Sequence, residues 1–171
     1  MTHIRPALPG DSELLANIGK TTFIEAHGHS ASPTDIAKYV AEKYREEVVA
    51  QELADPTNCY HIISHNDKPA GYSKIIMNSC HRQIPFENVT KLERLYLLSD
   101  FYDLKLGCEL LQFNIDLSHR QQQSGMWLYV WKENQRAIRF YTKAGFRIIG
   151  SHNFQISDRH SNPNHQMLLT Y

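Results

Sequence analysis

The short run Met126–Trp131 constrains the fold more than any other feature of the chain. It is almost wholly apolar, it follows Ser124-Gly125, and polar residues resume at Lys132. A strand that alternates apolar and polar residues keeps one face in solvent, whereas a continuous apolar strand is typical of burial on both faces. The run therefore predicts a central strand of a sheet that is flanked by helices.

Hydrophobic periodicity and turn residues place the other elements. A helix is predicted from Asp11 or Ser12 to Ala26, where apolar residues recur at helical spacing. A further helical region is predicted from a cap at Thr34 or Ser32 to Leu53, and further helices are predicted from Leu104 to Gln122 and over Asn134–Ala144. Strands are predicted over His3–Ala7, Cys59–His65, Lys68–Asn78, Val89–Leu98, Phe146–Ser157 and Gln166–Tyr171. With Met126–Trp131, this order predicts an α/β fold with a mixed sheet of about seven strands flanked by about four helices.

The strand Val89–Leu98 leads into a candidate anion-binding turn. Strict alternation predicts that Leu92, Arg94, Tyr96 and Leu98 share one face, and that Lys91, Glu93, Leu95 and Leu97 share the other. A loop and a helix follow at Tyr102–Leu111. The first turn of a helix has free N–H groups and the positive end of the helix dipole, and both favour a phosphate. Every strand-to-helix turn shares this property, so the spacing alone does not identify the ligand.

Composition excludes several classes of function. The 171 residues carry 18 Lys plus Arg and 18 Asp plus Glu, so the chain lacks the basic footprint of a nucleic-acid or membrane-surface protein. Three cysteines without Cys-x-x-Cys spacing argue against a disulfide framework or a metal site. The N-terminus lacks a signal-like apolar run, and no stretch reaches membrane-spanning length. We expect one cytoplasmic domain over residues 1–171, and pairing across a homodimer stays open.

A second block of residues carries a recognisable motif. The pattern Asn-x-x-Ala-x-x-Phe-Tyr-x-x-x-Gly-Phe falls at Asn134, Ala137, Phe140, Tyr141, Gly145 and Phe146. Together with the Val89–Leu111 block, it resembles the GNAT superfamily, the Gcn5-related N-acetyltransferases. The resemblance implies the acyl-CoA N-acyltransferase fold, whose central sheet is splayed. It also implies acetyl-CoA as co-substrate, no metal, and direct transfer of the acetyl group to an amine in a ternary complex.

The resemblance assigns residues to the CoA site. The backbone of Leu95, Tyr96 and Leu97 would pair with the pantetheine arm, and Asn134, with Ala137 in the same motif, would hold that arm further on. The pyrophosphate would lie on the N–H groups of Asp103, Leu104, Lys105, Leu106, Gly107 and Cys108. The family's first loop glycine is replaced here by Lys105, while Gly107 is kept. Glycine suits a positive φ or a close backbone approach, so Lys105 puts the loop geometry in question, and its ammonium could instead reach a phosphate.

Two residues are candidates for the chemistry. By resemblance, Tyr141 would protonate the departing thiolate; the alternative is a core tyrosine beside Phe140. Glu93 would remove the ammonium proton, acting through water; the alternative is an ion pair with Lys91 or Arg94. Tyr129, at the corresponding point of the next strand, is a weaker candidate base. Cys108 lies at a helix N-terminus, which lowers a thiol pKa, but no His or acidic partner is fixed by sequence, and the family transfers acetyl directly.

The acceptor is the least determined part of the prediction. Segments around Thr22–Ala26 and Ser32–Ile36, with Tyr39, Glu52-Leu53 and Gly71-Tyr72, are similar to the PaiA-type polyamine acetyltransferases. That likeness implies spermidine or spermine, with Glu25, Asp35 or Glu52 supplying negative charge and His27 or His29 lining the site. Other small amines, peptide α-amines and amino sugars stay open. A CoA-binding regulatory domain without catalysis, or a protein that binds another anion, is the alternative from a different class.

Overall fold

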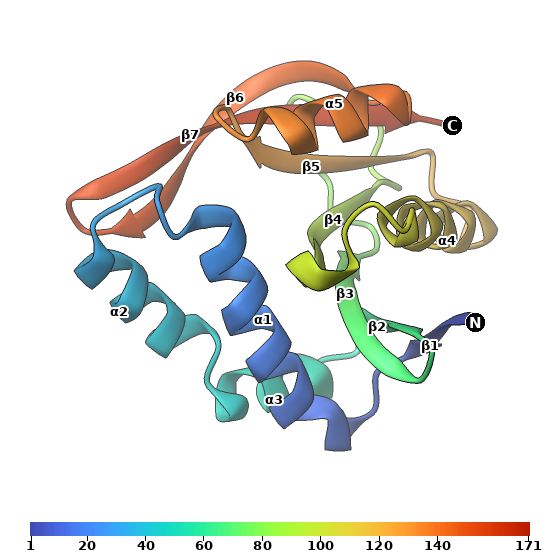
Figure 1. Cartoon of the computed structure of the whole chain (residues 1–171). Coiled ribbons are helices and arrows are strands. Elements are labelled where there is room, and N and C mark those ends of the chain that lie inside the picture. The colour runs from blue at the N-terminus through green and yellow to red at the C-terminus, as the bar shows by residue number, and fades with distance from the viewer. The chain divides into compact units, whose positions relative to one another are not determined.

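The computed structural model describes all 171 residues (Figure 1). They form two compact units. Unit 1 comprises Met1–Ile75 and Arg94–Asn114, and unit 2 comprises Ile76–Glu93 and Ile115–Tyr171. Seven strands form one sheet in the order β1-β2-β3-β4-β5-β7-β6, with five α-helices. The pairs β1·β2, β5·β7 and β6·β7 are antiparallel and β4·β5 is parallel, which confirms the predicted α/β fold with a mixed sheet. That the chain is one domain stays a prediction.

Unit 1 begins with β1 (Thr2–Pro6), the short 3-10 helix η1 (Pro9–Asp11) and α1 (Ser12–His27). The helical region predicted from a cap at Thr34 or Ser32 to Leu53 is confirmed, but the chain breaks at Tyr44-Arg45 and divides it into α2 (Pro33–Lys43) and α3 (Glu46–Ala54). The Ser32 hydroxyl caps α2, whereas Arg45 takes an extended conformation before α3. This break brings the number of α-helices to five instead of the predicted four.

The hairpin of unit 1 joins β2 (Asn58–His65) and β3 (Lys68–Ile76). Asn66 and Asp67 both have positive φ, 48° and 62°, as a two-residue hairpin turn requires. The faces of this unit are filled by two apolar clusters. The first gathers Leu15, Ala16, Ile18, Val49, Tyr60, Ile62 and Tyr72; the second gathers Ile63, Ala70, Leu106 and Leu110.

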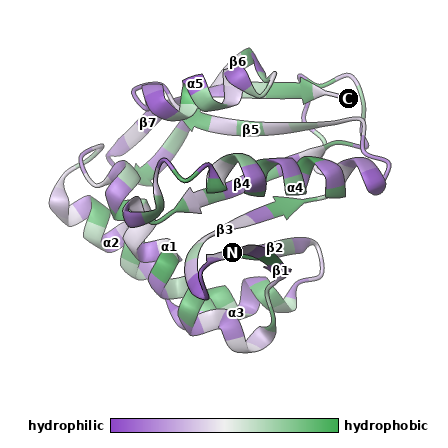
Figure 2. Cartoon of the chain, turned by 45° about the vertical axis from the view of Figure 1, so that its right-hand side comes forward, coloured by the Kyte–Doolittle hydropathy of each residue, from purple (hydrophilic) through white to green (hydrophobic).

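Strand β4 (Thr90–Leu97) does not keep the strict alternation predicted for it. The hydroxyl of Thr90 lies 2.6 Å from Ser118 Oγ on helix α4 (Leu106–Arg120), and Leu95 packs with Leu106 and Leu110 of the same helix. Residues five apart in a regular strand point to opposite faces. The alternation therefore breaks between Thr90 and Leu95, and the predicted division of β4 into two faces is wrong. Figure 2 shows apolar and polar bands alternating along α4, as expected for a helix with one buried side.

Unit 2 contains β5 (Gly125–Trp131), α5 (Gln135–Lys143), β6 (Arg147–Ser157) and β7 (His160–Thr170). Every residue of β5 except Tyr129 is buried, which confirms the prediction of a central strand. Strand β7 begins six residues earlier than predicted, because Asn162–Gln166 is polar in sequence yet pairs with β6, and Asn164–Gln166 with β5 as well. No helix in the chain has the length and apolar character needed to cross a bilayer.

Candidate active site

The loop before α4 adopts the backbone conformation that glycine usually provides. Lys105 has a φ of 62° and Asp103 a φ of 65°, so two non-glycine residues lie in the left-handed region. Each costs roughly 1–2 kcal/mol relative to an ordinary conformation. The chain thus keeps, at Lys105, the positive φ that the glycine of the family motif suggests, in spite of the substitution.

The amides at the end of this loop are not all available to a ligand. The carbonyl oxygen of Lys105 accepts from the N–H of Cys108 at 2.9 Å and from that of Glu109 at 3.2 Å. These bonds close the first turn of α4. The Cys108 amide is therefore already used, and the anion-binding prediction rests on the amides that precede it, up to Gly107. The side chains of Lys105 and Cys108 are exposed.

One edge of β4 presents backbone groups away from β3. The Leu98 amide donates to the Ala70 carbonyl of β3 at 2.9 Å. Gly71 permits this approach, because a Cβ there would lie 2.2 Å from the Tyr96 carbonyl oxygen. Since successive residues of a strand point their backbone groups to opposite edges, the amides of Leu95 and Leu97 face away from β3. Their side chains pack in the second cluster of unit 1, so their backbone is rigidly held.

In unit 2, the motif residue Asn134 is the N-cap of α5. Its Oδ1 accepts the N–H of Ala137 at 3.0 Å. This explains the Asn-x-x-Ala spacing in physical terms, because an N-cap side chain reaches the amide three residues later. The side-chain oxygen Oδ1 of Asn134 and the backbone N–H of Ala137 are consequently paired with each other. Any contact of Asn134 with a ligand would come from its Nδ2 donors.

Tyr141, the candidate acid, is buried on α5. Its ring packs edge-on against Phe140 and Phe146, with centroid separations of 5.0 and 5.5 Å. Burial raises the pKa of its phenol well above the usual value. The phenol therefore keeps its proton throughout the physiological range, as a proton donor must. None of the chain's hydrogen bonds engages its hydroxyl.

Glu93, the candidate base, forms the ion pair that sequence suggested as its alternative role. Its Oε2 lies 2.6 Å from Lys91 Nζ, and the two side chains are 30% and 22% exposed. The Lys91 ammonium also lies over the rings of Trp127 and Tyr129, 5.1 and 5.6 Å from their centroids. Arg94, the other predicted partner, instead binds Glu52 at 2.9 Å.

Sequence reasoning missed the histidines beside Tyr129. The ring of His152 stacks on Tyr129 with centroids 4.2 Å apart, and His81 Nε2 lies 3.2 Å from the Tyr129 hydroxyl. Burial raises the pKa of Tyr129. The order of strands β5, β7 and β6 would have placed His152 near Tyr129. His81 lies in an irregular loop, where no hydrophobic periodicity indicates its position. Tyr129 is therefore a fixed, protonated phenol and a poor base at neutral pH.

Comparison with known proteins identifies the family. Residues 24–146 match the Acetyltransferase (GNAT) family. The chain belongs to this family. It is therefore an N-acyltransferase that takes its acyl group from acetyl-CoA, as the two sequence blocks predicted.

Two curated relatives are uncharacterised N-acetyltransferases. One, from Lactobacillus delbrueckii subsp. lactis, is encoded in the pepI 3′ region; it is 28% identical over 141 residues, 82% of each chain. The other, from Mycobacterium tuberculosis strain H37Rv, is 28% identical over 89% of this chain and 93% of its own.

Solved structures share the GNAT fold. The PaiA N-acetyltransferase of Thermoplasma acidophilum, in complex with coenzyme A, superposes with a TM-score of 0.79 at 19% identity, over 100% of this chain and 99% of that one. The aminoglycoside acetyltransferase AAC(6′)-Ib, in complex with coenzyme A, gives 0.68 at 22% identity, over 99% and 95%.

The acidic residues predicted to attract a cationic acceptor all have partners inside this GNAT chain. Glu52 binds Arg94 and Lys74, with Nζ of Lys74 at 3.2 Å, so its charge is neutralised. Burial raises the pKa of Glu52, but these cations and the Tyr60 hydroxyl outweigh burial and hold the pKa below its usual value. Asp35 accepts from the cap residue Ser32. Glu25 accepts only from neutral donors, the amide and hydroxyl of Ser99 at 3.0 and 2.6 Å, and forms no ion pair.

His27 is the predicted acceptor-site histidine with a resolved role in unit 1. Its Nε2 lies 3.2 Å from the hydroxyl of Tyr96. Burial, with a smaller effect of His29, lowers the pKa of His27 to about 4. At neutral pH the ring is therefore uncharged and serves as a hydrogen-bonding partner rather than as a cation. No group of three or more His, Cys, Asp or Glu is arranged to hold a metal ion.

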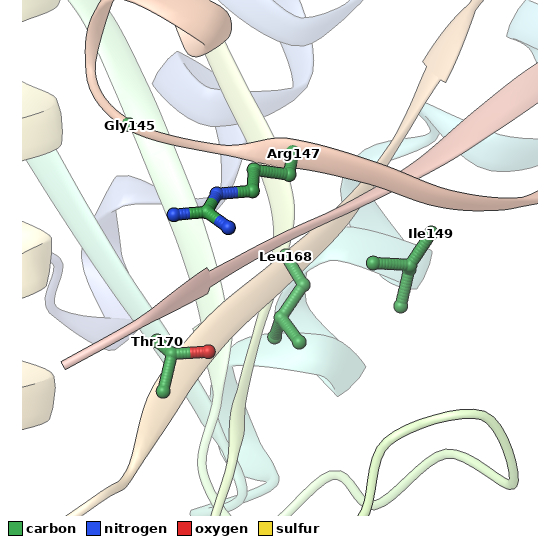
Figure 3. Close-up of a pocket in the computed structure, with 5 residues that line it drawn as sticks. All are labelled: Gly145, Arg147, Ile149, Leu168 and Thr170. Atoms are coloured by element: carbon green, nitrogen blue, oxygen red, sulfur yellow. The ribbon is translucent and has the colours of Figure 1, made fainter.

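Unit 2 has a pocket of about 330 Å³, and sequence assigned none of its lining residues to CoA binding or catalysis (Figure 3). Its lining consists of Gly145, Arg147, Ile149, Leu168 and Thr170. Figure 3 shows the side chains of Arg147, Ile149, Leu168 and Thr170, the first two on β6 and the last two on β7, whereas Gly145 precedes β6. The pocket has one cation and no acid or nucleophile, so it supplies no group for acetyl transfer.

Proposed function

We propose that the chain transfers acetyl from acetyl-CoA to the primary amine of a small molecule by direct attack in a ternary complex. The observation that carries the proposal is the loop before α4, where Lys105 holds a positive φ directly before the first amides of the helix. Consecutive amides in such a turn form a concave donor set for a diphosphate. The donors from Leu104 to Gly107 fit that group, and the edge amides of Leu95 and Leu97 fit the amide-bearing pantetheine arm.

The chemistry requires one base and, to a smaller extent, one acid. Glu93 takes a proton from the acceptor ammonium, through water, and the free amine attacks the thioester carbonyl carbon. The C–S bond then breaks, Tyr141 protonates the thiolate sulfur, and the second proton that the attacking nitrogen loses returns to the Tyr141 phenolate. A thiolate with a thiol pKa near ~8.5 already leaves readily, so the acid contributes at the low end of the ~10²–10⁴-fold typical of general catalysis. Proximity in the ternary complex supplies the rest.

Spermidine and spermine are the first acceptors to test. The likeness of the N-terminal half to PaiA-type enzymes supports them, and Glu25 adds an exposed carboxylate whose charge no cation neutralises. The neutralised Glu52 removes one of the three acidic groups on which the polyamine prediction relied. Peptide α-amines, amino acids and aminoglycosides complete the panel.

The decisive experiment measures thiol release from acetyl-CoA with each amine of the panel, beside calorimetric titration with CoA. Amine-dependent thiol release supports the enzyme. CoA binding without release from any amine would favour a regulatory domain, and absence of CoA binding would favour another anionic ligand. In the active case, Glu93→Gln should abolish the acidic limb of the pH–rate profile. An unchanged profile and turnover would show that Glu93 is not the base.

A further inference from the structure

Two amide side chains on β7 are buried without hydrogen-bond partners. Gln166 is 0% exposed, and neither its Oε1 nor its Nε2 has a partner; Asn164 is 7% exposed, and its Oδ1 has none. Most buried polar side-chain atoms in folded proteins are paired, and an unpaired one lowers stability. Two unpaired amide side chains in one strand therefore require an explanation. A ligand that supplies the missing hydrogen-bond partners would explain them.

The residues opposite Gln166 in the sheet do not pair with its amide. Gln166 lies directly opposite Tyr129 on β5 and Gly150 on β6. The Tyr129 hydroxyl is already close to His81 Nε2, at 3.2 Å, and Gly150 has no side chain. Asn164 lies opposite Trp131 on β5 and His152 on β6. Residues directly opposite in a sheet share a face, so both amides lie on the face of Tyr129 and His152.

The candidate base belongs to this same face of unit 2. Lys91 pairs with Trp127 in the register of β4 and β5, and its ammonium lies over the Trp127 and Tyr129 rings. Glu93 is held at 2.6 Å by that ammonium. The face runs from buried Gln166 through half-buried Tyr129 to exposed His152. It therefore carries both a proton acceptor for an amine and unpaired hydrogen-bond donors and acceptors.

The unpaired atoms specify the chemistry of what binds them. Two are carbonyl oxygens, which accept hydrogen bonds, and one is the Nε2 of Gln166, which donates two. A polyamine at neutral pH only donates, so it would leave Nε2 unpaired. A primary carboxamide carries two N–H donors and one C=O acceptor. It can pair with both ends of the Gln166 amide at once and still offer a donor to Asn164.

We propose that Gln166 and Asn164 recognise the amide group of an acceptor whose primary amine lies a few atoms away, as in an aminoacyl amide or a peptide N-terminus. This proposal rests on the acetyl transfer proposed above and names its acceptor class. Gln166 and Asn164 determine specificity, and they take no part in the proton transfers.

The test compares two acceptors and three variants. The acceptors are L-alanyl-glycinamide, which has the amide groups, and L-alanine methyl ester, which has a similar α-amine but no amide N–H. The variants are Gln166→Met, Asn164→Leu and the matched control Gln123→Met. Gln123 is also a buried glutamine of unit 2, but its Oε1 accepts from the Asn78 amide at 3.0 Å and its Nε2 donates to Asn78 Oδ1 at 2.9 Å.

We expect the wild-type protein to prefer the dipeptide amide by at least ~10-fold in kcat/KM, since one satisfied buried polar pair is worth about that much. Gln166→Met should remove most of this preference, Asn164→Leu part of it, and Gln123→Met none. At the same time Gln166→Met should raise the melting temperature by about 2–4 °C, because it relieves an unpaired amide. Gln123→Met should lower the melting temperature.

The outcomes separate this proposal from the proposed function. Thiol release from neither acceptor, nor from any amine of the panel, would overturn acetyl transfer itself. Equal kcat/KM for the two acceptors in the wild type, or a preference that survives Gln166→Met, would overturn amide recognition and leave the enzyme standing. A Gln166→Met protein that melts lower than wild type, or does not fold, would show that the amide is satisfied in the free protein and would also overturn the proposal.

Discussion

Each unit contains a group of buried polar side chains, and the two groups differ in whether they are complete. In unit 1, Glu52 binds Arg94, Lys74 and Tyr60, and Arg94 also lies 5.3 Å from the ring of Tyr44. In unit 2, Gln166 has no partner at either end of its amide. A buried polar network is stable when every member is satisfied and costly when one is not. The polar groups of the first set are therefore paired within the chain and stabilise the fold, whereas those of the second set are paired only by a bound ligand.

The largest effect should come from breaking the complete group. Glu52→Gln would leave Arg94 and Lys74 buried without a counter-charge. Removing one partner of a buried ion pair costs about 3–5 kcal/mol, and the lower end applies because the Glu52 side chain is 23% exposed. We expect the free energy of unfolding, measured in urea, to fall by about 3 kcal/mol.

Glu25→Gln is the matched control for this change. Its carboxylate is exposed and bonds only neutral Ser99, so its loss should cost less than about 1 kcal/mol. If the two variants lost equal stability, the Glu52 group would not be the structural centre of unit 1. Neither variant should change the acidic limb of the pH–rate profile.

A pair of tyrosines tests the same contrast in activity. The Tyr60 hydroxyl accepts from Arg94 at 2.7 Å and binds Glu52, whereas none of the chain's hydrogen bonds engages that of Tyr141. We expect Tyr141→Phe to lower kcat about 10²-fold, which corresponds to about 2.7 kcal/mol, with little loss of stability. Tyr60→Phe should instead cost about 1–3 kcal/mol of stability and leave kcat nearly unchanged.

Steady-state kinetics and urea unfolding of both variants test these expected effects on kcat and on stability. Because burial raises the pKa of Tyr141, the basic limb of kcat should also lie above the usual range for a phenol. A Tyr141→Phe enzyme with full turnover would return this residue to the role of a core tyrosine.

The sequence predicted those features that depend on local spacing. The apolar β5, the Asn134 cap and the helix after the Lys105 loop all follow from residues within one or two turns of each other. The features it missed depend on distant partners. Nothing near Tyr44 indicates a break between α2 and α3, and Asn162–Gln166 reads as a polar loop until β5 and β6 are placed on either side of it. The partner of Glu93 was predicted only as a choice between Lys91 and Arg94, because Glu52 lies 42 residues from Arg94.

His27 should make the stability of the protein depend on pH. Its folded-state pKa, about 4, lies below the ordinary 6.5 because the ring is buried. Between those values the unfolded chain binds more protons than the folded one, so stability is complete above pH 6.5 and is lost as the pH falls toward 4. For a partly exposed ring we expect a loss of about 2 kcal/mol over that window.

Urea unfolding at pH 7 and pH 4.5 measures this loss. His27→Gln should make the two values more alike, and exposed His3→Gln should not. A wild-type chain equally stable at both pH values would mean that the ring of His27 is solvated and can titrate freely.

The smallest effect concerns the loop before α4, which is strained but exposed. Lys105 and Asp103 share a positive φ and differ in charge, so Lys105→Gly and Asp103→Gly relieve similar strain and remove opposite charges. Glycine also gains entropy in the unfolded chain, which leaves a net stabilisation of about 0–1 kcal/mol for each.

Titration with CoA at low salt should show weaker binding for Lys105→Gly and tighter binding for Asp103→Gly, and both shifts should shrink as salt is added. If Lys105→Gly bound CoA equally or more tightly at low salt, the ammonium would not reach a phosphate. The loop would then act through its backbone alone, as the glycine form of the motif does, and Lys105 would carry strain without contributing affinity.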